Sequence, residues 1–121
     1  MAALAGAFGL SAPARVTRFG AAMTGAEKIV RVTIGGCVQG VGYRAWMEME
    51  ARALGVAGWV RNLSSGDVEA LFAGPSDAVE ALCAACWRGP AHARVDLVEV
   101  VEADPAALGP GAGFRQIATF G

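Results

Sequence analysis

Gly36-Cys37-Val38-Gln39-Gly40-Val41-Gly42-Tyr43-Arg44 lies between an alternating apolar run and a run with helical spacing. Glycines allow backbone N–H groups to turn toward a bound anion, and the start of a helix adds unpaired N–H donors and a partial positive charge. Arg44 adds a full charge with a forked set of donors. We therefore predict a strand, a glycine loop (residues 37–44) and a helix start that together bind an anion.

The elements around this loop follow from the spacing of apolar residues. Residues 28–34 alternate, which predicts a half-buried strand, and residues 43–54 have helical spacing that ends at Gly55. A second helix is expected after Gly74-Pro75-Ser76-Asp77, with Pro75 at its first helical position. The alternation of a later strand slips near Val98, as it would at a bulge. The remaining expectations are strands at 56–63, 68–73, 94–102 and 114–120, a turn at 64–67 and a loop at 104–113.

The order of these elements is β-α-β-β-α-β followed by one terminal strand. It predicts an α+β fold of the ferredoxin-like kind, a sandwich in which two helices cover one face of an antiparallel sheet, with a short extra C-terminal strand. We assign this domain to residues 27–121. Residues 1–26 contain no acid and show no periodic apolar face. We expect them to be a disordered or mis-called N-terminal extension, with an acid-free transit peptide as the alternative.

Charge and cysteine content narrow the function class and the compartment. Residues 27–121 hold eight basic and eleven acidic side chains, a net charge of −3, whereas a nucleic-acid binder usually has a basic face. No run of about 18 uncharged apolar residues predicts a membrane span. Cys37, Cys83 and Cys86 are an odd number of cysteines, and without a convincing signal peptide they indicate reduced thiols. We expect a cytoplasmic protein with no nucleic-acid or membrane partner.

A second segment, Gly58-Trp59-Val60-Arg61-Asn62, follows the predicted helix. With the glycine loop it resembles the acylphosphatase family, whose pattern is a Val-Gln-Gly-Val loop ending in Arg and then Gly-Trp-Val-x-Asn. Both parts stand in the expected order, and Asn62 lies 18 residues after Arg44, as in the family. The resemblance runs from about Lys28 to the C-terminus. It implies the same ferredoxin-like architecture and the hydrolysis of an acyl phosphate to a carboxylate and inorganic phosphate.

The resemblance also implies roles for the site residues. Arg44 would bind the phosphoryl group, and Asn62 would hold the attacking water in line with phosphorus. Judged without the family, Arg44 is also compatible with a solvated helix-start arginine and Asn62 with a turn residue. The expected substrate-binding residues are those of the glycine loop: Cys37, Val38, Gln39, Gly40, Val41, Gly42, Tyr43 and Arg44.

Within the loop we expect the glycines to set the geometry and Val38 and Val41 to pack while their N–H groups face the anion. Gln39 is expected to cap a backbone group inside the loop. The family often has a different residue at the Cys37 position and Phe at the Tyr43 position. Neither departure touches the proposed chemistry.

Cys83-Ala84-Ala85-Cys86 has the spacing of a metal or redox pair. A tetrahedral metal site needs four ligands, and only Cys37 and the single His92 remain as further candidates. The pair lies late in the predicted helix, on its apolar stripe, whereas a redox pair usually opens a helix, so we interpret the two residues as core cysteines. We expect no metal or cofactor, a small-molecule acyl phosphate as partner, and a monomer.

The sequence leaves two alternative functions open. One is an acylphosphatase-like domain for binding or carbamoyl-phosphate handling in a larger maturation system, and the other is a ferredoxin-like RNA-binding module.

Overall fold

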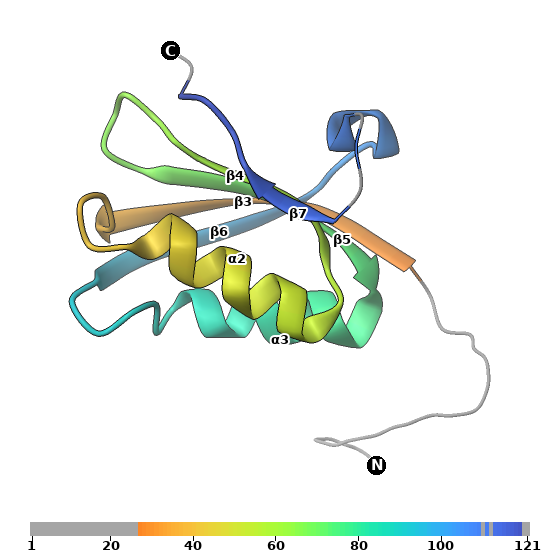
Figure 1. Ribbon diagram of the computed structural model, residues 1–121, viewed down its shortest axis with the longest axis horizontal. Helices are drawn as coiled ribbons and strands as arrows, with labels where there is room; N and C mark the ends of the chain where they lie inside the picture. Colours follow the sequence, from red (N-terminus) through yellow and green to blue (C-terminus); the bar gives the residue numbers. More distant parts are fainter. Residues whose placement is uncertain (1–26, 110, 112, 120–121) are drawn as a thin grey trace.

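The computed structural model describes residues 27–109, 111 and 113–119, and Figure 1 shows the arrangement of their elements. The N-terminal extension proposed for residues 1–26 lies outside the described residues. In chain order the elements are β3 (Glu27–Cys37), α2 (Tyr43–Leu54), β4 (Ala57–Asn62), β5 (Val68–Pro75), α3 (Ser76–Cys86), β6 (Arg94–Glu102), the 3-10 helix η1 (Pro105–Leu108) and β7 (Phe114–Gln116).

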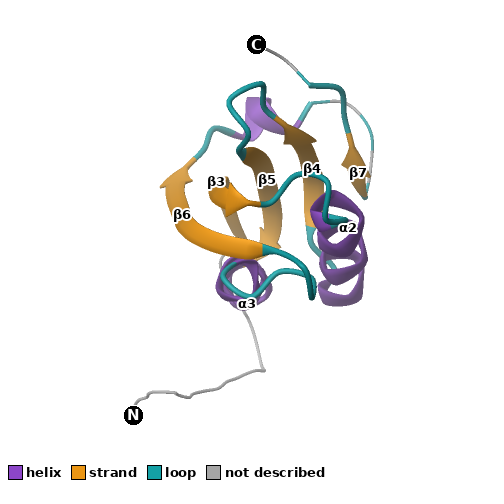
Figure 2. Cartoon of the chain, turned by 90° about the vertical axis from the view of Figure 1, so that its left-hand side faces the viewer, coloured by secondary structure: helices purple, strands orange, loops and turns teal. Residues whose placement is uncertain are grey.

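The strands form one five-stranded sheet in the order β6-β3-β5-β4-β7. The pairs β3–β6, β3–β5 and β4–β5 are antiparallel, and β7 adds to the edge parallel to β4. Figure 2 shows α2 and α3 on one side of the sheet and η1 on the other. The ferredoxin-like α+β sandwich is therefore present, with an extra C-terminal strand that makes the sheet mixed.

The core fills the space between the sheet and the two helices. Alternation places Val30, Val32 and Ile34 on the covered face of β3, where they are at most 2% exposed. Helix α2 buries Tyr43, Met47 and Ala51 against them, and α3 buries Val79, Leu82, Ala85 and Cys86. Leu54, the last residue of α2, is 37% exposed because it stands in the last turn.

Several boundaries differ from the predicted ones for physical reasons. Pro75 has an extended backbone and is the N-cap of α3, so its predicted place at the first helical position is wrong. The slip predicted near Val98 lies at Asp96, because Gly35 pairs with Leu97 and Gly36 with Val95. This extra residue allows Val95 and Val98, three positions apart, both to pack against the core.

The remaining differences lie at the ends of elements. Pairing with β6 extends β3 to Cys37, which is exposed at the strand end and is not yet in the loop. The predicted loop 104–113 contains η1, whose N-cap Asp104 accepts a hydrogen bond from the Ala106 N–H. The last strand ends at Gln116, earlier than predicted.

The face of the sheet opposite α2 and α3 bears a charged cluster around Trp59. Arg31 and Arg61 stack over the indole and both contact the carboxylate of Glu69, with Arg61 Nε 2.8 Å from it. The indole N–H donates to the Ala107 carbonyl of η1, and Trp59 is 7% exposed. The indole is therefore unavailable for stacking on bases, which disfavours RNA binding on this face.

Candidate active site

The glycine loop and Asn62 meet at one end of the sheet. The register pairs Ile34 of β3 with Val68 of β5, and the same Val68 with Asn62 of β4. The end of β3, the start of β5 and the end of β4 therefore lie side by side, and the chain leaves β3 there to form the loop that starts α2 (Figure 1). Residues far apart in sequence are brought together by strand pairing.

The backbone of the glycine loop is shaped by left-handed residues. Gly40 has φ +77° and Gly42 has φ +80°, a region that side chains disfavour, and a Cβ added at either position would meet nothing within 4 Å. The requirement for glycine here is therefore conformational and not a matter of space. Gly42 is the N-cap of α2, and no side chain caps this helix.

The loop presents backbone donors without protein partners. Within the described part of the chain, no hydrogen bond engages the N–H groups of residues 38–42 or the first three N–H groups of α2. The first helical bond runs from the Trp46 N–H to the Gly42 carbonyl, 3.0 Å. Such donors at a helix N-terminus, where the dipole is positive, are suited to an anion.

Apolar side chains fix the loop to the core while its backbone stays accessible. Val38 is 1% exposed, and Val41 packs partly buried against the core. Tyr43 is also 1% exposed, and its hydroxyl donates to the Cys86 carbonyl at the end of α3, 2.5 Å. Burial, followed by the contacts with Cys86, raises the Tyr43 pKa well above its ordinary value of 10.0. The tyrosine hydroxyl thus joins the two helices, a role that the sequence interpretation missed.

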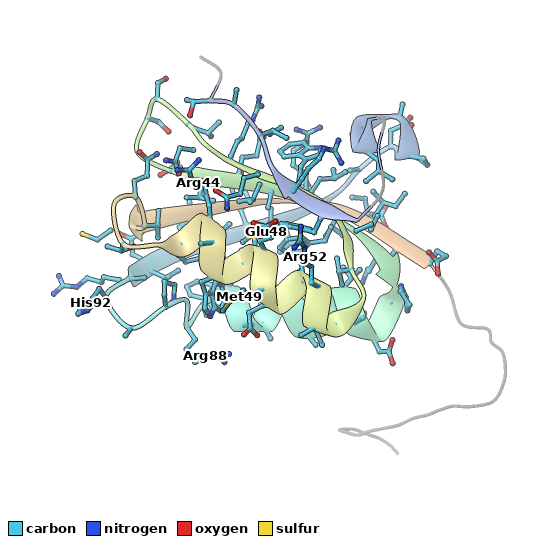
Figure 3. All side chains as sticks on the ribbon, viewed as in Figure 1. Arg44, Glu48, Met49, Arg52, Arg88 and His92 are labelled. Atoms are coloured by element: carbon cyan, nitrogen blue, oxygen red, sulfur yellow. The ribbon has the colours of Figure 1, made fainter. Side chains whose placement is uncertain are left out.

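Arg44 is the second residue of α2 and is partly exposed. Figure 3 shows it at the loop end of α2, with Glu48 and Arg52 further along the helix. Glu48 pairs with Arg52, 2.7 Å, and accepts a hydrogen bond from Gln116, so this carboxylate is engaged away from Arg44. Within the described ranges, Arg44 has no ion pair or hydrogen-bond partner, which leaves its guanidinium open to an anion at the loop.

Asn62 is the last residue of β4 and is partly buried. Alternation places its side chain on the same face as Val60, which is fully buried in the core beneath α2 and α3. Its neighbour Arg61 points to the opposite face, where Glu69 holds it. Among the described residues, no hydrogen bond engages the Asn62 amide, so both its donor and its acceptor are available to a small molecule.

Gln39 makes a contact that differs from the expected one. Its amide nitrogen donates to the Leu63 carbonyl and to the Asp67 carbonyl, both at 2.8 Å. These carbonyls belong to the β4–β5 turn, so the expectation that Gln39 caps a group inside the glycine loop is wrong. A glutamine in a loop signals a capping amide, but its partners depend on which strands pair.

The cysteines have the features of packed thiols. Cys86 is fully buried on α3, and burial raises its pKa to about 12; burial also raises the pKa of the partly buried Cys83. Both therefore stay protonated near neutral pH, unlike thiolate metal ligands. Within residues 27–109, 111 and 113–119, no three His, Cys, Asp or Glu side chains gather as a metal site would require.

A hollow of about 550 Å³ lies at the other end of α2. Its lining includes Arg52, Val56 and Phe114, and neither Arg44 nor Asn62 belongs to it. Arg52 is already engaged there by Glu48 and by the Phe114 carbonyl. The hollow is therefore separate from the glycine loop.

No helix among the described residues is long and apolar enough to cross a membrane.

Comparison with known proteins matches this arrangement to one family. The acylphosphatase family model matches residues 30–117. An acylphosphatase of Nitrobacter hamburgensis is 52% identical over 97 residues, covering 77% of this chain and 98% of the relative. One of Rhodospirillum rubrum is 52% identical over 89 residues, covering 74% and 94%.

Solved structures give the same result. An acylphosphatase from Coxiella burnetii superposes with a TM-score of 0.69 at 36% identity and covers 75% of this chain and 93% of its own. A full-length HypF, solved with phosphate and nucleotide bound, has a TM-score of 0.70 over 13% of its length, but at 23% identity it shows the fold alone. The family model covers most of the chain and the relatives align over nearly their whole length, so this chain belongs to the acylphosphatase family, hydrolases of acyl phosphates.

Proposed function

We propose that this chain hydrolyses its acyl phosphate with Arg44 and the N–H groups of the glycine loop binding the phosphoryl group and Asn62 orienting the attacking water. The observation that carries the proposal is the run of unpartnered N–H donors that continues from the loop into the first turn of α2. Arg44 is the second residue of that helix, so one full charge stands at the same helix start as the backbone donors.

The chemistry suits a site without a strong base. Water attacks phosphorus, the phosphorus–oxygen bond to the acyl group breaks, and its electron pair leaves with the carboxylate. A carboxylate is a stable leaving group, so no general acid has to protonate it. In a loose phosphoryl-transfer transition state the water is little deprotonated when it attacks, and it loses its proton as phosphate forms. Orientation by the Asn62 amide and stabilisation of the phosphoryl charge by Arg44 are therefore sufficient roles.

The other residues of the glycine loop complete the proposed site. Val38 and Val41 hold the loop on the core while their N–H groups face the phosphoryl oxygens, and Gly40 and Gly42 allow the backbone to curve around them. We further propose a monomeric, cytoplasmic enzyme that uses no metal. Its free thiols support the proposed cytoplasmic compartment. Sedimentation of the purified protein tests the monomer, and turnover in the presence of a chelator tests the independence from metal.

The decisive experiment is the Asn62→Ala variant with benzoyl phosphate as substrate. We expect kcat to fall about 100-fold or more, because misplacing a reacting group by about 1 Å already costs that much. The inhibition constant of inorganic phosphate should change little, since Arg44 and the loop amides bind it. A stable variant with a near-normal kcat would remove Asn62 from the mechanism.

A further inference from the structure

One side-chain amide joins the glycine loop to the strand end that carries Asn62. The Gln39 amide nitrogen lies 2.8 Å from the Leu63 carbonyl and 2.8 Å from the Asp67 carbonyl, in a partly buried position. Leu63 directly follows Asn62 in the chain. Leu63 and Asp67 also pair with each other, since the Leu63 N–H donates to the Asp67 carbonyl at 2.8 Å.

The chemistry of this contact suits a primary amide. Each acceptor already receives one backbone N–H, the Leu63 carbonyl from Gly66 at 3.1 Å and the Asp67 carbonyl from Leu63. Each therefore has one lone pair left, and the two hydrogens of the Gln39 amide match these two lone pairs. A methionine at position 39 would have a thioether with no hydrogen to donate, and a glutamate there would place a negative carboxylate against the two carbonyl oxygens.

Apart from its two internal backbone hydrogen bonds, the β4–β5 turn has few other attachments. Ser64 and Ser65 are exposed, and the hydrogen bond from the Asp67 N–H to the Ser65 hydroxyl is long, 3.4 Å. The glycine loop, in contrast, keeps other attachments, namely the buried Val38 side chain and the Tyr43 hydroxyl. Loss of the Gln39 amide would therefore release the turn beside Asn62 more than it would release the phosphate-binding backbone.

We propose that Gln39 is a positioning residue that fixes the distance between the phosphate-binding loop and the Asn62 amide, and thus the alignment of water with phosphorus. The inference rests on the proposed role of Asn62. Gln39 acts through its side chain on the turn, in addition to any contact of its backbone N–H with phosphate.

The test is the Gln39→Met variant, which keeps the length of the side chain and removes both hydrogens. With benzoyl phosphate we expect kcat to fall about 10- to 100-fold, with the phosphate inhibition constant within about threefold of wild type. Gln116→Met is the matched control, because exposed Gln116 donates to Glu48 outside the glycine loop. In this control both constants should stay within about twofold of wild type. A normal kcat in Gln39→Met overturns the inference, as does a parallel loss of kcat and phosphate affinity.

Two further measurements separate positioning from a structural effect. In Gln39→Glu the introduced carboxyl can donate one hydrogen bond when protonated, so kcat relative to wild type should rise as pH falls from 8 to 5; a flat ratio contradicts the role. In an Asn62→Ala background, Gln39→Met should cost little more, because it acts through Asn62. A full additional loss overturns the inference.

The same experiments separate this inference from the proposed function. Absence of benzoyl phosphate hydrolysis by wild type, or normal turnover by Asn62→Ala, would refute the proposed function itself. An active wild type with a defective Asn62→Ala and a normal Gln39→Met would refute the positioning role alone.

Discussion

Replacing Tyr43 by Phe tests how the active-site helix is fixed to the rest of the core. The Tyr43 hydroxyl donates to the Cys86 carbonyl at 2.5 Å, and Cys86 is fully buried at the C-terminal end of α3. The neighbouring N–H groups of Trp87, Arg88 and Gly89 bond to the carbonyls of Ala84 and Ala85 instead. The hydroxyl therefore satisfies a carbonyl that the helix itself leaves without a partner.

The expected magnitude follows from that carbonyl. Phe keeps nearly the whole ring volume, so the substitution creates no large cavity, but it leaves a buried acceptor unsatisfied, which costs about 1–3 kcal/mol. For a domain of 60–100 residues each kcal/mol lowers Tm by about 4–8 °C. Because the hydroxyl points away from the N–H donors of the loop into the core, kcat per folded molecule should be unchanged.

Urea unfolding of wild type and Tyr43→Phe, followed by Trp fluorescence, measures the difference. Ser65→Ala is a suitable control, since it removes a hydroxyl from an exposed turn and should change stability by less than about 0.5 kcal/mol. A loss below about 0.5 kcal/mol in Tyr43→Phe would refute the reasoning about the carbonyl. A fall in kcat for the folded protein would show instead that the hydroxyl takes part in the chemistry.

Three other outcomes are expected. Arg44→Ala should weaken phosphate inhibition by about tenfold or more and lower kcat/KM with it. Arg44→Lys should restore neither quantity, because an ammonium cannot copy the forked contact of the guanidinium. Inhibition kinetics that match wild type would exclude Arg44 from phosphate binding. Inorganic phosphate at about 100 times its Kd should add about 2.7 kcal/mol to the free energy of unfolding, and a melt equal to a chloride control at matched ionic strength counts against the anion site. The free energy of unfolding should fall as pH rises above about 9. In the unfolded chain Cys86 and Tyr43 lose protons near pH 9.0 and 10.0, whereas burial keeps both neutral in the fold, with the Cys86 pKa at about 12, so their contribution to stability is full below pH 9. Urea midpoints that stay constant from pH 8 to 11 would contradict this expectation.

The fold and the glycine loop were predictable because their signals are local. The alternation in β3 and the apolar stripe of α2 reflect one face buried against the same core, so periodicity indicates both. Gly40, Gly42 and Arg44 are contiguous, and a helix start after glycines has one geometry whatever surrounds it. Local rules therefore sufficed for the sandwich and for the placement of the loop.

What the sequence did not reveal depends on pairing between distant segments. The partners of Gln39 are set by the β4–β5 turn, and the partner of the Tyr43 hydroxyl by the end of α3, 43 residues later. The parallel addition of β7 to β4 likewise follows from the connection between β6 and β7, which passes by way of η1 across the face of the sheet opposite α2 and α3. No periodicity encodes these contacts, because each joins two places whose relative position exists only after folding.

The uncapped start of α2 links stability to function. Ser, Thr, Asp and Asn are the preferred residues at a helix start, where the side chain satisfies an N–H group of the first turn, and loss of such a cap costs about 1 kcal/mol. Here the N-cap is Gly42 and no side chain takes that place. An aspartate cap would occupy the donors that a phosphoryl group needs and would repel its charge. The free protein therefore lacks a stabilising contact at the point where the substrate supplies one, so part of the stabilisation of α2 is expected to appear only when phosphate binds.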